Sequence, residues 1–225
     1  MTNPVPPRFN ETSIYMAGSS HFSDRHYFKT PFINYRHQSS RIKEIEVHSI
    51  SGGYLDQSWI HDMKRFVRSQ SSDQQILIVV MLACNAIRKD PKDIGPILRT
   101  HDHMIRAFRH RWNVRIILCG AISSPRSDPR TRVSFTRLDG SLKDLASESP
   151  QSIRYFPTNS LFMKDDKIDT DLFADRLHLT ARGARKLIAA LHDFIHECLG
   201  VHYIRGTGIH HYPIRDWSFA PKAIE

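Results

Sequence analysis

The chain has 225 residues, of which 40% are hydrophobic, and its formal net charge is +9. This length suits one α/β domain with short tails, and the hydrophobic fraction is enough to form a core. The longest hydrophobic run, 76–84, is too short to span a bilayer, and the proline-rich start lacks the apolar centre of a secretory signal. We therefore expect a cytoplasmic protein with no membrane insertion, and the positive charge favours polyanions such as RNA as partners.

The three cysteines, Cys84, Cys119 and Cys198, all lie in apolar segments. None of them belongs to a CxxC motif or another metal-binding spacing. This pattern is typical of reduced thiols in the core of an intracellular protein. The sequence predicts no metal site and no cofactor.

Strands and helices alternate after a flexible N-terminal lead at 1–12. Short segments rich in apolar and β-branched residues predict strands, at 13–17, 45–49, 76–82, 114–119 and 152–156. Apolar residues at helical spacing predict the helices between and after them, at 55–68, 94–111, 132–146 and from the cap Thr180 to Gly200. The domain is thus expected over 13–200, with an irregular C-terminal tail at 201–225.

This alternation favours a parallel sheet of about five strands with helices on both faces. The segment 76–82 is apolar at every position, as expected of a central parallel strand. In such folds ligands bind beyond the carboxyl ends of the strands. Four short polar or glycine-containing elements are expected at that rim: Gly18-Ser19-Ser20, Gly52-Gly53, Cys84-Asn85 and Asp175-x-x-His178.

These elements contain the parts of a serine hydrolase. Ser20 can act as the nucleophile once His178 accepts its proton, and Asp175 can orient the imidazole. The backbone N–H groups of Ser20 and Gly53 and the amide of Asn85 can stabilise an oxyanion. Each residue alone fits an ordinary turn, cap or surface histidine equally well. Only their order and spacing together favour the catalytic interpretation.

That order resembles the SGNH (GDSL-type) hydrolases over about 13–199. The first block of the family corresponds to Gly18-Ser19-Ser20, and the second to Gly53, with Gly52 as the alternative. The third block corresponds to Ala83-Cys84-Asn85-Ala86, and the fourth, Asp-x-x-His, to Asp175-Arg176-Leu177-His178. The resemblance implies a flavodoxin-like, doubly wound sheet and a serine esterase acting on an ester or acyl small molecule.

The blocks also depart from the family pattern. Ser19 replaces the aspartate of the first block, Ala83 and Ala86 replace the glycine and aspartate of the third, and Arg176 stands where glycine is common. Similar departures characterise the Oskar-type germ-plasm domains, which resemble SGNH hydrolases but bind RNA without catalysis. Oskar-type domains are expected to lack the catalytic set, whereas Ser20, Asn85, Asp175 and His178 are present here. Esterase-like domains of retroelements keep that set.

The alternative hypothesis is therefore a catalytically inactive SGNH-like domain that binds RNA through a basic surface. Arginine is suited to phosphate because its planar guanidinium binds two oxygens. The candidate contacts are Arg36, Arg41, Lys43, Arg176, Arg182 and Arg185. RNA binding predicts an affinity that falls steeply with salt, whereas hydrolysis predicts a reactive Ser20.

Overall fold

The computed structural model describes residues 11–23, 25, 27–34 and 42–199, and the backbone of 202–204 and 208–210. Five parallel strands form the central sheet in the order β2-β1-β3-β4-β5. They are β1 (Thr12–Gly18), β2 (Ile42–Ser49), β3 (Gln75–Met81), β4 (Val114–Cys119) and β5 (Ile153–Phe156). The predicted α/β class with five parallel strands is confirmed, and each predicted strand overlaps an observed one.

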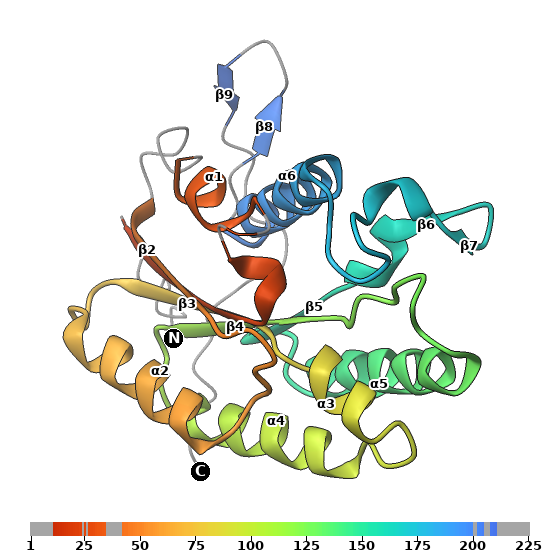
Figure 1. The fold of residues 1–225 in the computed structure, drawn as a ribbon. Helices are drawn as coiled ribbons and strands as arrows, with labels where there is room; N and C mark the ends of the chain where they lie inside the picture. Colours follow the sequence, from red (N-terminus) through yellow and green to blue (C-terminus); the bar gives the residue numbers. More distant parts are fainter. Residues whose placement is uncertain are drawn as a thin grey trace.

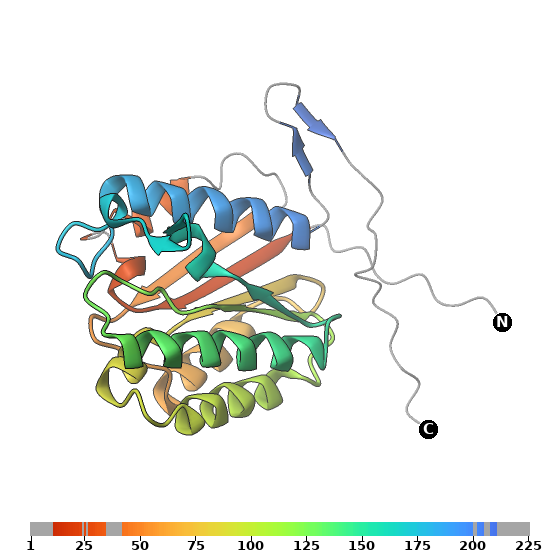
Figure 2. The same cartoon turned by 90° about the vertical axis from the view of Figure 1, so that its right-hand side faces the viewer.

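Helices cover both faces of this sheet, which makes it doubly wound (Figure 1, Figure 2). One face carries α1 (Lys29–Asn34) and α6 (Ala181–Cys198). The other carries α2 (Gln57–Ser69), α4 (Gly95–Phe108) and α5 (Pro129–Ser147). The short α3 (Cys84–Lys89) follows β3 and packs against α5. Because the strands are parallel, all five carboxyl ends meet at one edge of the sheet.

The core consists of the sheet and the inner faces of these helices. Every residue of β1 and β3 is buried, because both strands have neighbours on each side and helices on each face. On the α1 and α6 face, the rings of Phe22, Phe28 and Phe32 stack in sequence, with centroids 4.5 and 5.2 Å apart. The ring of His192 in α6 lies 4.4 Å from that of Phe32.

Helix starts at the carboxyl edge are fixed by side-chain caps. Asp56 accepts hydrogen bonds from backbone N–H groups in the first turn of α2, and Asp128 does the same for α5. The predicted Thr180 cap is confirmed, since its Oγ1 accepts from Gly183 N at 3.1 Å. A Cβ on Gly183 would lie 2.4 Å from Leu172 O, so this glycine allows α6 to pack tightly against η5 (Thr170–Leu172).

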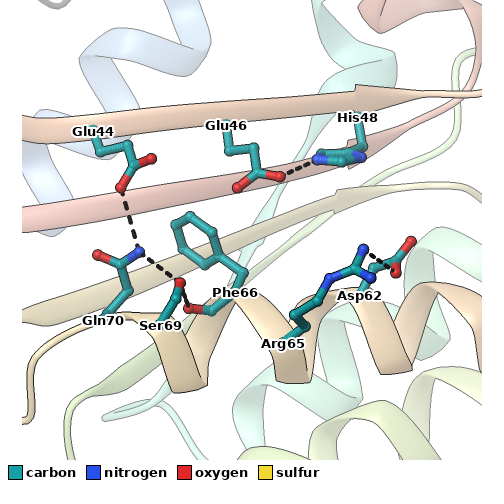
Figure 3. A network of polar contacts seen from close by, with 8 residues as sticks. All are labelled: Glu44, Glu46, His48, Asp62, Arg65, Phe66, Ser69 and Gln70. Atoms are coloured by element: carbon teal, nitrogen blue, oxygen red, sulfur yellow. Dashed lines mark hydrogen bonds and ion pairs between the residues drawn. The ribbon is translucent and has the colours of Figure 1, made fainter.

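The edge strand β2 presents polar side chains toward α2 (Figure 3). The Gln70 amide donates to Glu44 Oε2 at 3.3 Å, and Glu46 pairs with His48. Charged side chains along an edge strand discourage pairing with another chain.

The structure adds elements that the hydropathy pattern does not predict. These are α1, α3, the 3₁₀ turns η1 (Ser20–Phe22), η4 (Thr158–Phe162) and η5, and the two-residue strands β6 (Met163–Lys164) and β7 (Lys167–Ile168). The C-terminal segment is not wholly irregular, because β8 (His202–Ile204) and β9 (Gly208–His210) pair as antiparallel strands. Gly200, the predicted helix terminator, and most of the predicted N-terminal lead lie outside the described residues. Within the described ranges, no helix combines the length and hydrophobicity needed to cross a bilayer.

Candidate active site

Ser20 lies just beyond the carboxyl end of β1, at the first residue of the turn η1. Gly18 is the last residue of β1, and a Cβ there would lie 2.2 Å from the ring of Phe22, so a glycine lets the turn pack against the end of the strand. Ser19 N donates to Met81 O at 3.3 Å, which ties the start of the turn to the end of β3. Ser20 itself is 7% exposed. Ser20 therefore lies on the turn after the first strand, where the sequence predicts it.

Asp175 and His178 form a tight local pair in the loop before α6. Asp175 Oδ1 accepts from the backbone N–H groups of Leu177, at 3.0 Å, and His178, at 2.6 Å. Its Oδ2 accepts from the imidazole Nδ1 of His178 at 2.7 Å. The hydrogen bond from the backbone N–H of His178, followed by the one from its side chain, holds the pKa of Asp175 well below its ordinary value. An ionised carboxylate only accepts, so the ring donates through Nδ1, and a neutral ring then carries its basic lone pair on Nε2.

His21 connects the loop of Ser20 to the loop of His178. Its Nε2 lies 3.4 Å from Leu177 O, and its ring centroid lies 6.1 Å from that of His178. Its Nδ1 lies 3.2 Å from Ser19 Oγ. Sequence reasoning assigned His21 no role, although the Ser-Ser-His run directly after a strand was visible. The turn that carries Ser20 is thus held against the loop that carries His178, and the direct pairing of Ser20 Oγ with His178 Nε2 stays a prediction.

Gly53 and Asn85 meet across the end of β1. The Nδ2 atom of Asn85, which follows β3, donates to Gly53 O at 3.0 Å. The chain reaches Gly53 through a turn in which Gly52 has φ +74° and Gly53 N donates to Ile50 O at 2.9 Å. The Gly53 N–H was expected to bind an oxyanion, but here it closes this turn. The second N–H of the Asn85 amide and the N–H of Ser20 are the remaining donors of the predicted set.

Similar folds occur among solved structures, although sequence comparisons find nothing: no protein-family model and no curated protein matches the chain. An acylhydrolase candidate from Bacteroides fragilis has a TM-score of 0.66 at 15% identity, over 87% of this chain and 92% of that one. A G-D-S-L family lipolytic protein from Veillonella parvula has a TM-score of 0.62 at 15% identity, over 81% and 97%. An acetylxylan esterase from Geobacillus stearothermophilus has a TM-score of 0.58 at 13% identity, over 87% and 97%.

The chain has the SGNH hydrolase fold. These structures confirm the fold that the four sequence blocks imply. At sequence identities this low, the comparisons show the fold alone. Ala83, which replaces the glycine of the third block, has φ −85° and ψ −26°, a conformation open to any residue. Arg176 has φ +63°, so it adopts the left-handed conformation that glycine favours.

The predicted RNA contacts that the structure describes lie at opposite edges of the sheet. Lys43 lies at the start of β2, at the amino edge of the sheet, where its Nζ is 3.6 Å from Glu11 Oε2. Arg176 lies at the opposite, carboxyl edge, and the exposed Arg182 and Arg185 lie in the first turns of α6. Arg36 and Arg41 lie outside the described residues.

A cavity of about 600 Å³ lies beside the Gly53 and Asn85 pair and was not predicted. Its lining is contributed by residues that follow Gly53, residues of and around α3, and the first turns of α2 and α4, namely Tyr54, Leu55, Asp56, Gln57, Leu82, Ala86, Lys89, Asp90, Asp93, Pro96, Ile97 and Thr100. These segments are distant in sequence, so no local pattern could indicate the cavity. Across the described part of the chain, no three His, Cys, Asp or Glu side chains gather as metal ligands would.

Proposed function

We propose that this chain is a serine hydrolase that cleaves esters or acyl groups of small molecules. Ser20 is the nucleophile, His178 the general base and acid, and Asp175 the orienting carboxylate. Asn85 and the backbone N–H of Ser20 stabilise the oxyanion, with Gly53 holding the Asn85 amide through its carbonyl oxygen. The observation that carries this proposal is the hydrogen bond between Asp175 Oδ2 and His178 Nδ1 at 2.7 Å.

The first half of the reaction forms an acyl-enzyme. Ser20 Oγ attacks the ester carbonyl carbon while His178 Nε2 takes its proton, and the carbonyl oxygen becomes an oxyanion. The tetrahedral intermediate collapses when the carbon–oxygen bond to the alcohol breaks, and Nε2 protonates the leaving alcohol. Water then attacks the acyl-serine by the same route, releasing the acid and restoring Ser20. Asp175 stays ionised throughout, which agrees with its lowered pKa.

Two further observations support this assignment. The contact between His21 and Leu177 joins the turn that carries Ser20 to the loop that carries His178, as the proposed catalytic set requires. The acetylxylan esterase with the same fold has been solved as catalytic mutants in which a serine or an aspartate is replaced by alanine. In this chain we assign a serine and an aspartate, Ser20 and Asp175, to the catalytic set.

Labelling with a fluorophosphonate probe tests the proposal directly. The wild-type protein should be labelled on Ser20, as located by peptide mass spectrometry, and Ser20→Ala should abolish the label. Ser23→Ala is the matched control, since Ser23 lies on the same turn and its Oγ donates to Ser20 O at 2.7 Å. Folded wild-type protein that resists the probe and hydrolyses no activated ester would refute the hydrolase assignment.

RNA binding is the second candidate function, favoured by the net charge of +9. Arg176, Arg182 and Arg185 are exposed, and no other described residue forms an ion pair with them. The logarithm of the affinity for single-stranded RNA should then fall linearly with the logarithm of the salt concentration. Substituting Arg176 by Glu should weaken binding, whereas Ser20→Ala should leave it intact. Binding that is absent or insensitive to salt would exclude this candidate.

A further inference from the structure

Arg88 is a partly buried guanidinium, and no acidic side chain in the described part of the chain forms an ion pair with it. It lies on α3, and its closest polar contact is a long one, 3.5 Å from Nη2 to Ser124 Oγ. Its charged group also lies 6.0 Å from the ring centroid of Phe135. A buried arginine is normally paired with a carboxylate, because removing its charge from water is unfavourable. The described residues supply no such partner, and a negatively charged ligand would provide one.

The position of Arg88 connects it to the candidate catalytic residues. It lies three residues after Asn85 on the same helix, so the two side chains are close neighbours on its surface. Its contact residue Ser124 belongs to the loop after β4, and in that loop Arg126 N donates to Arg176 O at 3.0 Å. Arg176 directly follows Asp175. A continuous set of contacts thus runs from the oxyanion side of the rim to the loop of the base.

Arg126 and Arg176 add two more positive charges to this side of the rim. Both are exposed, and within the described ranges neither forms an ion pair. Burial lowers the pKa of Arg88, the neighbouring Cys84 raises it, and the charge of Arg126 lowers it, so Arg88 and Arg126 lie within electrostatic reach of one another. Like charges held together without a counterion destabilise the folded protein, and an anion bound between them would relieve the repulsion.

We propose that Arg88, Arg126 and Arg176 form an anion site at the edge of the candidate active site, which receives a carboxylate or phosphate carried by the ester substrate. The proposal rests on the hydrolase function for its substrate and names the substrate class: an ester with a negatively charged group separated from the scissile bond. Arg88 binds two oxygens of that group through its planar fork, and the charges of the two exposed arginines add to the attraction.

A matched pair of substrates tests the site in the full-length protein. Mono-4-nitrophenyl adipate carries a free carboxylate, and its methyl ester has the same chain without the charge. The wild type should prefer the anionic ester, and Arg88→Gln should reduce the ratio of the two kcat/KM values roughly tenfold, the size expected for one hydrogen-bonded charge. Arg176→Gln should also reduce this ratio of kcat/KM values. Because Arg176 is exposed, this second variant tests the site even if Arg88→Gln impairs folding.

Arg68→Gln is the charge-matched control, because Arg68 is exposed in the last turn of α2, at the amino edge of the sheet. An unchanged ratio in both Arg88→Gln and Arg176→Gln, or an equal fall in Arg68→Gln, would overturn the proposal.

Calorimetric titration with adipate and with inorganic phosphate separates this proposal from the proposed function. If neither ester is hydrolysed, the hydrolase assignment fails, and the titration alone decides on the anion site. Tighter binding of adipate identifies a carboxylate site, and tighter binding of phosphate identifies a phosphate site. Binding of neither anion, or binding that Arg88→Gln does not weaken, would contradict the inference.

Discussion

Replacing the buried His192 by leucine should remove a large part of the acid sensitivity of this fold. His192 is 2% exposed, its ring packs on Phe32, and its Nε2 lies 3.4 Å from Phe32 O. Burial lowers its pKa to about 4, and the neighbouring His196 acts in the same direction. In the unfolded chain the imidazole returns to an ordinary pKa of about 6.5.

The sign of the effect follows from proton binding. Between pH 6.5 and 4 the unfolded chain binds a proton at His192 that the folded protein does not, so the free energy of unfolding falls as pH falls. The stabilisation is complete above the unfolded pKa and is lost progressively down to the folded one. A shift from about 6.5 to about 4, at 1.36 kcal/mol per unit, amounts to about 3 kcal/mol.

Urea unfolding of the wild type and of His192→Leu, from pH 8 to pH 4, measures this contribution. The difference between their free energies of unfolding should fall by about 3 kcal/mol over that range. Any change in packing caused by leucine adds an offset that is already present at pH 8. Asp139 has the opposite pH dependence, because burial raises its pKa to about 6. Its contribution to the free energy of unfolding is therefore lost as pH rises from 3.8 to 6. Because Asp139 is present in both proteins, its effect cancels, and a difference independent of pH would refute the reasoning.

Three other predictions follow from local geometry. Asp175→Asn removes the acceptor that fixes the imidazole tautomer, so the rate of fluorophosphonate labelling should fall by about three to four orders of magnitude. Gly183→Ala should destabilise the fold by roughly 1–3 kcal/mol in urea unfolding, because the new Cβ would lie 2.4 Å from a backbone oxygen. Gly140→Ala in α5 should instead stabilise the fold by up to about 1 kcal/mol, because nothing lies within 4 Å of the new Cβ. Arg176→Gly should stabilise the fold by about 0.5–1 kcal/mol, measured in the same way.

The features that could be predicted from sequence depend on neighbours along the chain. The strands follow from short apolar runs, and Asp175 and His178 lie only three positions apart, so both are visible as patterns. The helix at Thr180 was recognised for the same reason, from a cap followed by an apolar stripe. His192 and His196 were missed in that stripe, because histidine does not count as apolar, yet both are buried among apolar side chains.

The features that could not be predicted depend on contacts between distant segments. The role of Arg88 rests on Ser124, 36 residues away, and on a loop contact between Arg126 and Arg176. The Gly53 N–H was assigned to an oxyanion because glycine permits close approach, but the turn formed by Gly52 directs it to Ile50. A dipeptide of glycines does not specify which way its amides point.

Two substitutions of the strained residue Arg176 test whether function maintains an arginine at this position. A side chain other than glycine at φ +63° raises the energy of the loop, and such strain tends to persist where the residue has a role. Arg176→Gly removes both the strain and the guanidinium, whereas Arg176→Ala removes the guanidinium and keeps the strain. The glycine variant should therefore be more stable than the alanine variant by about 0.5–1 kcal/mol, while both lose the preference for the anionic ester to the same degree. Equal stability of the two variants would contradict the strain argument, and a preference retained in both would remove Arg176 from the anion site.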